Sequence, residues 1–280
     1  MRADPGPRPS ADAGLVGGAP RDPWRRSRVW WRSIGSIVAV VMLLGGVARV
    51  VGALAERREP VDEVVDAAGI DSLRIELSNS DVVVVGADVE NISITGTVTS
   101  GLRRSDFRAG AEGGRVLVTL GCGPMQAFHD CSADLHIEVP RDLAVSVDAP
   151  NTALAVRDLT GPVDASTSNS SLSVAALDGP VRLRATNGSV EATGLRSDEV
   201  DVATSNDDVE LEFLESPRSV VVRSTNAAAT VVVPDDDAFY DLQLSTSNGD
   251  TRAEVRADPD SERLMRVTTS NDDIVVRYPG

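Results

Sequence analysis

Apolar and polar side chains alternate with a period of two over most of the chain, in short runs on either side of recurring asparagines. Apolar or small residues stand two, four and six positions before each asparagine, and they resume three and five positions after it. Val200 and Val202 precede Asn206 in this way, and Val209 and Leu211 follow it. Such alternation is typical of half-buried β-strands. Each asparagine is therefore predicted to mark a bend between two strands.

This strand, bend and strand unit recurs along the chain. The asparagines that stand at the predicted bends are Asn79, Asn151, Asn169, Asn187, Asn206, Asn226, Asn248 and Asn271. From Asn151 onward they are 18 to 23 residues apart, and a nearly constant spacing indicates a repeat architecture. Gly-Pro-Val at 161–163 and at 179–181 marks a second turn in each unit.

Two architectures fit this pattern, an antiparallel meander of hairpins and a β-solenoid in which each repeat is one coil. We favour an all-β solenoid of about eight strand–Asn-turn–strand repeats, because only Asn187 and Asn248 are followed by glycine. A two-residue type I′ hairpin needs positive φ at both central residues, whereas one left-handed asparagine tolerates any successor. A solenoid also closes two apolar faces on each other. Its stacked asparagines are expected to form a hydrogen-bonded ladder.

The repeat is interrupted by an insertion at about 99–133. Residues 115–120 and 133–140 are predicted strands, and the loop between them holds Cys122 and Cys131, the two cysteines of the chain. In an exported protein a local disulfide between them is the expected outcome. The alternative is a metal site that adds His129 and His136 to the two thiolates.

The N-terminal part is predicted to direct the chain out of the cytoplasm. Residues 1–33 are rich in Pro, Gly, Ala and Arg, without periodicity, and are expected to be a disordered basic tail. Residues 34–55 contain one charge, Arg49, and are long enough to form a transmembrane helix. The arginines before this span predict a single-pass membrane protein with its N-terminus inside and its C-terminus outside. The alternative is a signal peptide cleaved near Ala55, which would release a secreted protein.

The remaining stretches are expected to be a linker over residues 56–69 and an extracytoplasmic β-repeat domain over residues 70–280. The strand–TSNG–strand repeats, together with Val139-Pro140 and Val233-Pro234, resemble the bacterial putative-adhesin family of β-strand-repeat proteins, which is related to GIN domains. The resemblance covers roughly residues 70–280. It implies a β-helical, membrane-anchored module outside the cytoplasm, and it supplies no catalytic residue.

Charge and composition limit the kinds of ligand that the chain is expected to bind. The chain has a net charge of −16, and residues 1–58 contain ten Arg against four acidic residues, so the negative charge lies in the predicted ectodomain. An acidic surface repels phosphate backbones, which argues against nucleic-acid binding. Acidic bends such as Asn206-Asp207-Asp208 offer oxygen ligands for Ca²⁺ but lack the repeat spacing of calcium-binding β-rolls. We therefore expect no metal and no cofactor.

The expected function is that of a non-catalytic, adhesin-like surface module. Its partners would be the membrane, through one span, and an unidentified extracytoplasmic protein or cell-wall ligand. The chain has no nucleophile elbow, phosphate-binding loop or zinc-protease motif, so no residue is assigned to catalysis. Two alternatives stay open: an envelope regulatory or sensor protein that couples the ectodomain to a membrane partner, and a glycan-active β-helix enzyme.

Overall fold

The computed structural model describes residues 34, 38–46, 57–101, 105–122 and 131–280. The chain divides into two compact units, Met1–Val50 and Val51–Gly280. Within the first unit, residues 38–46 form a short helix.

The transmembrane helix predicted over residues 34–55 is not found. In the described part of the chain, no helix combines the length and the apolar character needed to cross a membrane. Residues 35–37 and 47–55 of the predicted span, and the predicted tail over 1–33, lie outside the described residues.

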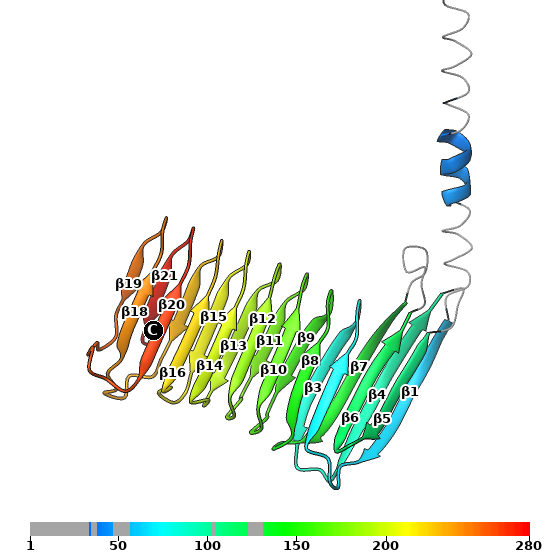
Figure 1. Cartoon of the computed structure of the whole chain (residues 1–280), viewed down its shortest axis with the longest axis horizontal. Coiled ribbons are helices and arrows are strands. Elements are labelled where there is room, and N and C mark those ends of the chain that lie inside the picture. The colour runs from blue at the N-terminus through cyan, green and yellow to red at the C-terminus, as the bar shows by residue number, and fades with distance from the viewer. Residues whose placement is uncertain (1–33, 35–37, 47–56, 102–104, 123–130) are drawn as a thin grey trace, which may run out of the picture. The chain divides into compact units, whose positions relative to one another are not determined.

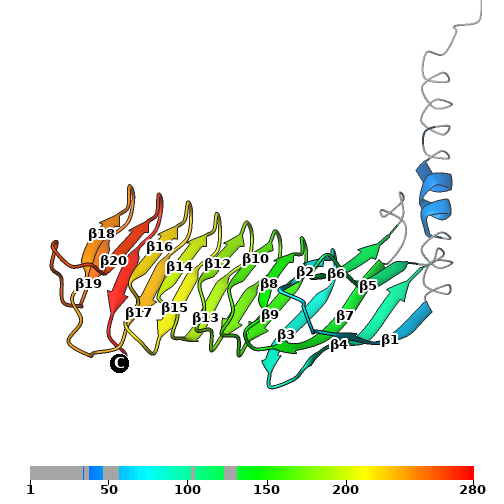
Figure 2. The same cartoon turned by 60° about the horizontal axis from the view of Figure 1, so that its bottom comes forward.

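The second unit consists of two β-sheets whose strands lie side by side (Figures 1 and 2). In spatial order, the eleven-stranded sheet contains β1 (Arg57–Asp66), β4 (Asn91–Ser100), β7 (Cys131–Pro140), β3 (Asp81–Ala87), β9 (Ala153–Arg157), β11 (Leu172–Ala175), β13 (Val190–Leu195), β15 (Val209–Phe213), β17 (Ala229–Val232), β21 (Ile274–Arg277) and β19 (Thr251–Ala253). The ten-stranded sheet contains β18 (Asp241–Ser245), β20 (Leu264–Thr268), β16 (Ser219–Arg223), β14 (Glu199–Ala203), β12 (Val181–Ala185), β10 (Val163–Thr167), β8 (Ala144–Asp148), β2 (Ser72–Glu76), β6 (Arg115–Gly121) and β5 (Asp106–Glu112). Strand β1 lies in the stretch that we expected to be a linker.

Both sheets are mixed, so the prediction of an all-β solenoid of about eight strand–Asn-turn–strand repeats is corrected. From β3 to β19 and from β18 to β6, neighbouring strands are parallel, but β4 pairs antiparallel with both β1 and β7. Strand β5 pairs antiparallel with β6 through a tight turn at Gly113 and Gly114, both with positive φ. Glycine at both turn positions favours such a hairpin. The antiparallel pairings involve β1, β4, β5, β6 and β7, all between residues 57 and 140.

Spatial order differs from chain order at both ends of the parallel stack. Strands β2 and β3 lie between the β6/β7 pair and the β8/β9 pair, and β20 and β21 lie between the β16/β17 pair and the β18/β19 pair (Figure 1). Met265 of β20 is the register partner of Val220 on one side and of Leu242 on the other. At the C-terminal end, the later pair β20/β21 therefore occupies the inner position and leaves the earlier pair β18/β19 at the edge.

Burial explains why the β20/β21 pair lies inside. Its inward side chains are apolar and fully buried: Met265, Val267, Ile274 and Val276. On the β18/β19 pair, Leu242 and Leu244 are only half-buried, and Thr251 and Ala253 are exposed. A terminal pair has one neighbouring strand in each sheet, so its inward side chains stay partly in contact with water. Because each Å² of buried apolar surface stabilises the fold by about 25 cal/mol, the more apolar pair gains more from the inner position.

The core lies between the two sheets and is lined by the apolar residues of the alternation, such as Val200, Val202, Val209 and Leu211. The Gly-Pro turns stack closely at the sheet ends. A Cβ atom on Gly179 would lie 2.4 Å from the carbonyl oxygen of Gly161, so this contact requires glycine.

Truncation of Met265 and Leu242 tests the observed strand order. Met265→Ala should lower the free energy of unfolding by about 2–5 kcal/mol, because it opens a cavity in the core. Leu242→Ala should cost clearly less, because Leu242 already contacts solvent. Urea denaturation measures both values. A larger loss for Leu242→Ala would mean that the pairs are stacked in chain order.

Substitutions at two adjacent positions of β14 test the inward and outward faces. Val202→Asp should destabilise the protein by several kcal/mol, because it places an unpaired charge in the core. Asp201→Ser removes an exposed ion pair with Arg223 and should cost about 0.2–1 kcal/mol. Similar melting temperatures for the two variants would contradict the assigned faces.

Candidate functional site: a groove across the ten-stranded sheet

A groove of about 510 Å³ crosses the outer face of the ten-stranded sheet, over β2, β8, β10, β12, β14 and β16. Two outer rows of residues line it, together with the buried side chains of Val145, Val163, Val181 and Val200. The central row consists of Ser146, Asp164, Arg182, Asp201 and Val221. The turn row, where the strands begin, consists of Ser72, Ala144, Pro162, Pro180, Glu199 and Ser219. The groove is open to solvent and combines apolar surface with charged and hydroxyl groups.

Parallel pairing in register builds the central row. Ser146 pairs with Asp164, Asp164 with Arg182, Arg182 with Asp201, and Asp201 with Val221. Each residue stands between two inward residues of its strand, so its side chain points outward. Adjacent strands are about 4.8 Å apart. The row therefore presents one side chain per strand at that interval.

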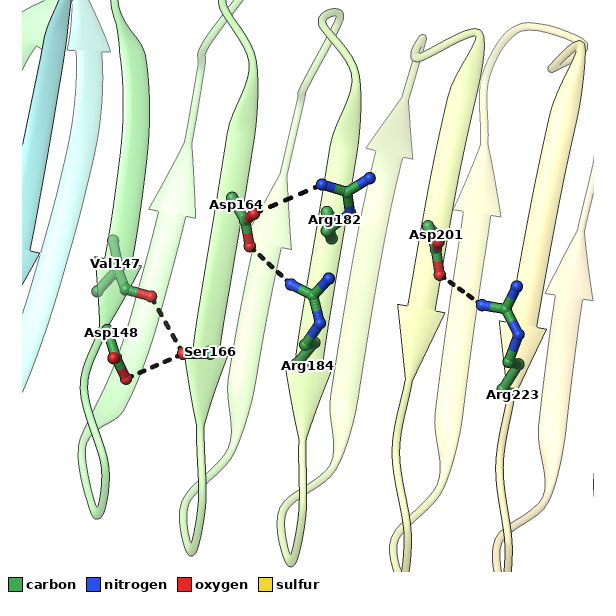
Figure 3. A network of polar contacts seen from close by, with 8 residues as sticks. All are labelled: Val147, Asp148, Asp164, Ser166, Arg182, Arg184, Asp201 and Arg223. Carbon is green, nitrogen blue, oxygen red and sulfur yellow. Dashed lines mark hydrogen bonds and ion pairs between the residues drawn. The ribbon is translucent and has the colours of Figure 1, made fainter.

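The charged side chains of this face are paired between neighbouring strands (Figure 3). Asp164 accepts a hydrogen bond from Arg184 at 3.0 Å and lies 3.8 Å from Arg182. Arg223 donates to Asp201 at 3.0 Å. These side chains are between 40% and 58% exposed, so each pair stabilises the fold by less than about 1 kcal/mol. The pairs orient the carboxylates while leaving them accessible to a ligand.

The structure brings seven of the eight asparagines together. Their side chains form a continuous chain of hydrogen bonds, each Nδ2 donating to the next Oδ1 over 2.5–2.9 Å, in the order Asn248, Asn271, Asn226, Asn206, Asn187, Asn169 and Asn151. This ladder follows the spatial order of the strands. The backbone N–H of Asn79 donates to the carbonyl of Pro150. Only Asn79 and Asn151 have positive φ, so the left-handed conformation that we expected at every bend occurs at two of the eight.

The predicted disulfide is confirmed. Cys122 and Cys131 are bonded, with their Cα atoms 5.8 Å apart. The bond closes the loop between β6 and β7, in the place that an asparagine bend takes in later strand pairs. Of the metal-site alternative, His129 lies outside the described residues and His136 is exposed on β7. Among the residues that the structure describes, no group of three or more His, Cys, Asp or Glu side chains could hold a metal ion.

Carboxylates at the acidic bends bind backbone N–H groups of neighbouring bends. Asp208 accepts a hydrogen bond from the N–H of Ala228 at 3.1 Å, and Asp273 accepts one from Asp250 at 2.8 Å. These two side chains therefore connect adjacent strand pairs.

A polar network near the C-terminal strands was missed from the sequence. The hydroxyl of the fully buried Tyr240 lies 2.7 Å from that of Ser216, which donates to Asp236 at 2.8 Å. Arg263 donates to the carbonyls of Ser216 and Pro217. Burial raises the pKa of Tyr240, against the lowering effect of its hydrogen bond with Ser216. The available signal was the pair Phe239-Tyr240 after three aspartates, in a chain with 3% aromatic residues.

Arg256 also binds the connection between β17 and β18. Its guanidinium pairs with Asp235 at 3.2 Å and with Asp237 at 2.9 Å, and it lies 6.0 Å from the centre of the Tyr278 ring. This connection bypasses the β20/β21 pair. The ion pairs of Arg256 with Asp235 and Asp237 therefore stabilise the connection that lets β18 lie beyond β20 in the sheet.

The raised pKa of Tyr240 predicts a loss of stability at high pH. An unfolded chain ionises the phenol near pH 10, while the folded protein keeps it neutral to higher pH. The free energy of unfolding should therefore fall as the pH rises above about 10, until the pH passes the folded pKa. Tyr240→Phe should cost about 0.5–1.5 kcal/mol at neutral pH through the lost hydrogen bond, but it cannot ionise.

The gap in stability between the wild-type protein and Tyr240→Phe should consequently narrow as the pH rises from about 9 to 11. Urea denaturation at a series of pH values measures it. A gap that does not change with pH would show that the Tyr240 phenol is not held neutral by burial.

Comparison with known proteins gives distant structural similarity to solved structures. No family model matches the chain, and neither does any curated protein sequence. The relation to the putative-adhesin family and to GIN domains therefore stays a prediction. Among solved structures, the chain is similar to a putative cell adhesion protein from Clostridium sporogenes, with 8% sequence identity and a TM-score of 0.38. The match covers 80% of this chain and all of that protein.

Proposed function

We propose that this protein is a non-catalytic, adhesin-like module that acts outside the cytoplasm and attaches to its partner through the outer face of the ten-stranded sheet. The observation that carries the proposal is the central row, in which register pairing aligns charged and hydroxyl side chains across consecutive strands. Such a surface offers several contacts along a line. Contacts that are individually weak add up when a partner engages several of them.

The interior supports a role without catalysis. Among the described residues, the buried side chains are apolar or are serines and threonines, such as Thr152 and Ser197, with the phenol of Tyr240 as the ionisable exception. Enzyme sites gather ionisable groups in partly buried positions, where their pKa values are shifted toward the reaction. Here the carboxylates and guanidinium groups of the groove lie at the surface and pair with each other. This arrangement is suited to binding.

The disulfide supports a location outside the cytoplasm. Structural disulfides persist in oxidising compartments and are rare where glutathione keeps thiols reduced. Cys122 and Cys131 are joined within one short loop. The partner would accordingly be an extracytoplasmic protein or a cell-wall ligand.

Retention of bacterial envelope fragments tests the proposal. Beads coated with the purified full-length chain should retain more labelled fragments than beads coated with serum albumin. The double variant Ser146→Arg/Val221→Arg, which fills the central row, should retain at least tenfold fewer. The matched control Ser173→Arg/Thr230→Arg places the same side chains on outward positions of β11 and β17 in the other sheet and should behave as wild type.

Release of soluble saccharide or peptide from the fragments would contradict the proposal, because it would reveal catalysis. Retention no greater than on albumin beads would contradict it as well. Thermal unfolding of both variants checks that they fold.

A further inference from the structure

We propose that Asn248 is a site of spontaneous deamidation, and that its conversion to aspartate or isoaspartate loosens the terminal strand pair β18/β19. Three observations carry the proposal: the glycine that follows Asn248, its place at the end of the asparagine ladder and the exposure of its bend. Asn248 does not line the groove. The modification therefore affects a part of the protein that the proposed attachment does not use.

The reaction requires water and no other reagent. The backbone nitrogen of Gly249 attacks Cγ of Asn248, so that an N–Cγ bond closes a succinimide ring and the Cγ–Nδ2 bond breaks. Nδ2 leaves as ammonia and takes up the proton of the Gly249 nitrogen. Water then opens the ring. Opening at Cγ gives aspartate, whereas opening at the backbone carbonyl gives isoaspartate, whose main chain is one carbon longer.

The residue after an asparagine controls how easily this attack occurs. Glycine has no Cβ, so its nitrogen approaches Cγ with less hindrance than the nitrogen of a residue that carries a side chain. Among the asparagines of the predicted bends, only Asn187 and Asn248 are followed by glycine. The two sites share the same reactive dipeptide, so a difference between their rates in the folded protein reports on the surrounding structure.

Asn187 is held from both sides. Its Nδ2 donates to Oδ1 of Asn169 at 2.8 Å, and its Oδ1 accepts a hydrogen bond from Nδ2 of Asn206 at 2.6 Å. Gly188 is buried, and strand pairs flank this bend on both sides. The side chain would have to leave both ladder contacts before Cγ could approach the Gly188 nitrogen. The structure therefore protects Asn187.

Asn248 is held from one side. Its Nδ2 donates to Oδ1 of Asn271 at 2.8 Å and to the carbonyl of Ser270 at 3.3 Å. Within the described strands and bends, no side chain donates to its Oδ1, because β18 and β19 are the last strands at this end of the two sheets (Figure 1). Gly249 is exposed. Edge segments open locally at a lower free-energy cost than the interior, so Asn248 reaches the geometry of attack more often than Asn187.

The product weakens the contact between the last two bends. A carboxylate at position 248 cannot donate, so the hydrogen bonds to Oδ1 of Asn271 and to the carbonyl of Ser270 are lost. The same two bends contain Asp250 and Asp273, whose backbone N–H and carboxylate are hydrogen-bonded to each other at 2.8 Å. The new negative charge is repelled by these carboxylates. Deamidation is therefore expected to loosen β18 and β19.

Peptide mapping of the full-length chain by mass spectrometry, after storage at mildly alkaline pH, tests the site. In the folded protein, Asn248 should convert at least tenfold faster than Asn187. In concentrated urea, where the ladder is absent, the two sites should convert at similar rates. Equal rates in the folded protein would overturn the proposal, and so would a tenfold difference that persists in urea.

A ladder variant tests the protection directly. Asn206→Ala removes the donor to Oδ1 of Asn187, so it should speed the conversion of Asn187 and leave the rate at Asn248 unchanged. Thermal unfolding checks that this variant folds, and the comparison of the two sites in the wild-type protein does not depend on it. An unchanged rate at Asn187 in the folded variant would overturn the protective role of the ladder.

Hydrogen exchange of the full-length chain, followed by mass spectrometry, tests the effect on the strands. In Asn248→Asp, which carries one of the two products, the amides of β18 and β19 should exchange at least tenfold faster than in the wild type, and those of β12 and β14 at the same rate. The matched control Asn248→Ser is neutral and keeps a donor, so its exchange should stay close to the wild type. Unchanged exchange in Asn248→Asp, or equal acceleration in both variants, would overturn the proposed loosening.

Discussion

Parallel backbone hydrogen bonding between in-register strands is the interaction on which the rest of this structure depends. It brings residues about 18 to 23 positions apart in the chain into adjacent rows. Inward rows then become a continuous apolar core, bend rows become the asparagine ladder, and outward rows become the groove. A one-residue slip in a single strand would disturb all three features at once, because side chains alternate between faces.

Local features of the fold were predictable because they depend on neighbours in sequence. The alternation identified Val202 as inward and Asp201 as outward, and the two cysteines close to each other indicated a disulfide. Strand order was not predictable in the same way, because Met265 and Leu242 occupy the same register and either could pair with Val220. The arrangement with β20/β21 inside differs from the one with β18/β19 inside in the amount of apolar surface that it buries. That quantity belongs to the whole strand pair and is not visible in any short motif.

For the candidate site, too, the sequence predicts the orientation of single side chains but not the pairing between strands. Asp164, Arg182 and Asp201 were recognisable as outward residues, but their alignment into one row follows from pairing between strands. The Tyr240 network depends on two connections that are distant in sequence. The antiparallel strands near β4 follow from residues outside the repeat, for which the period carried no information.

The inner position of β20 and β21 has a consequence for biosynthesis. The ribosome makes β18 and β19 before the strands that separate them from β16 and β17. Until the later pair is made, the nascent chain can dock β18 directly on β16 in the same register, because both strands pair with β20 through equivalent residues. The mature order then requires that this early contact opens. This order of strands therefore allows a folding intermediate in which β18 occupies the place of β20.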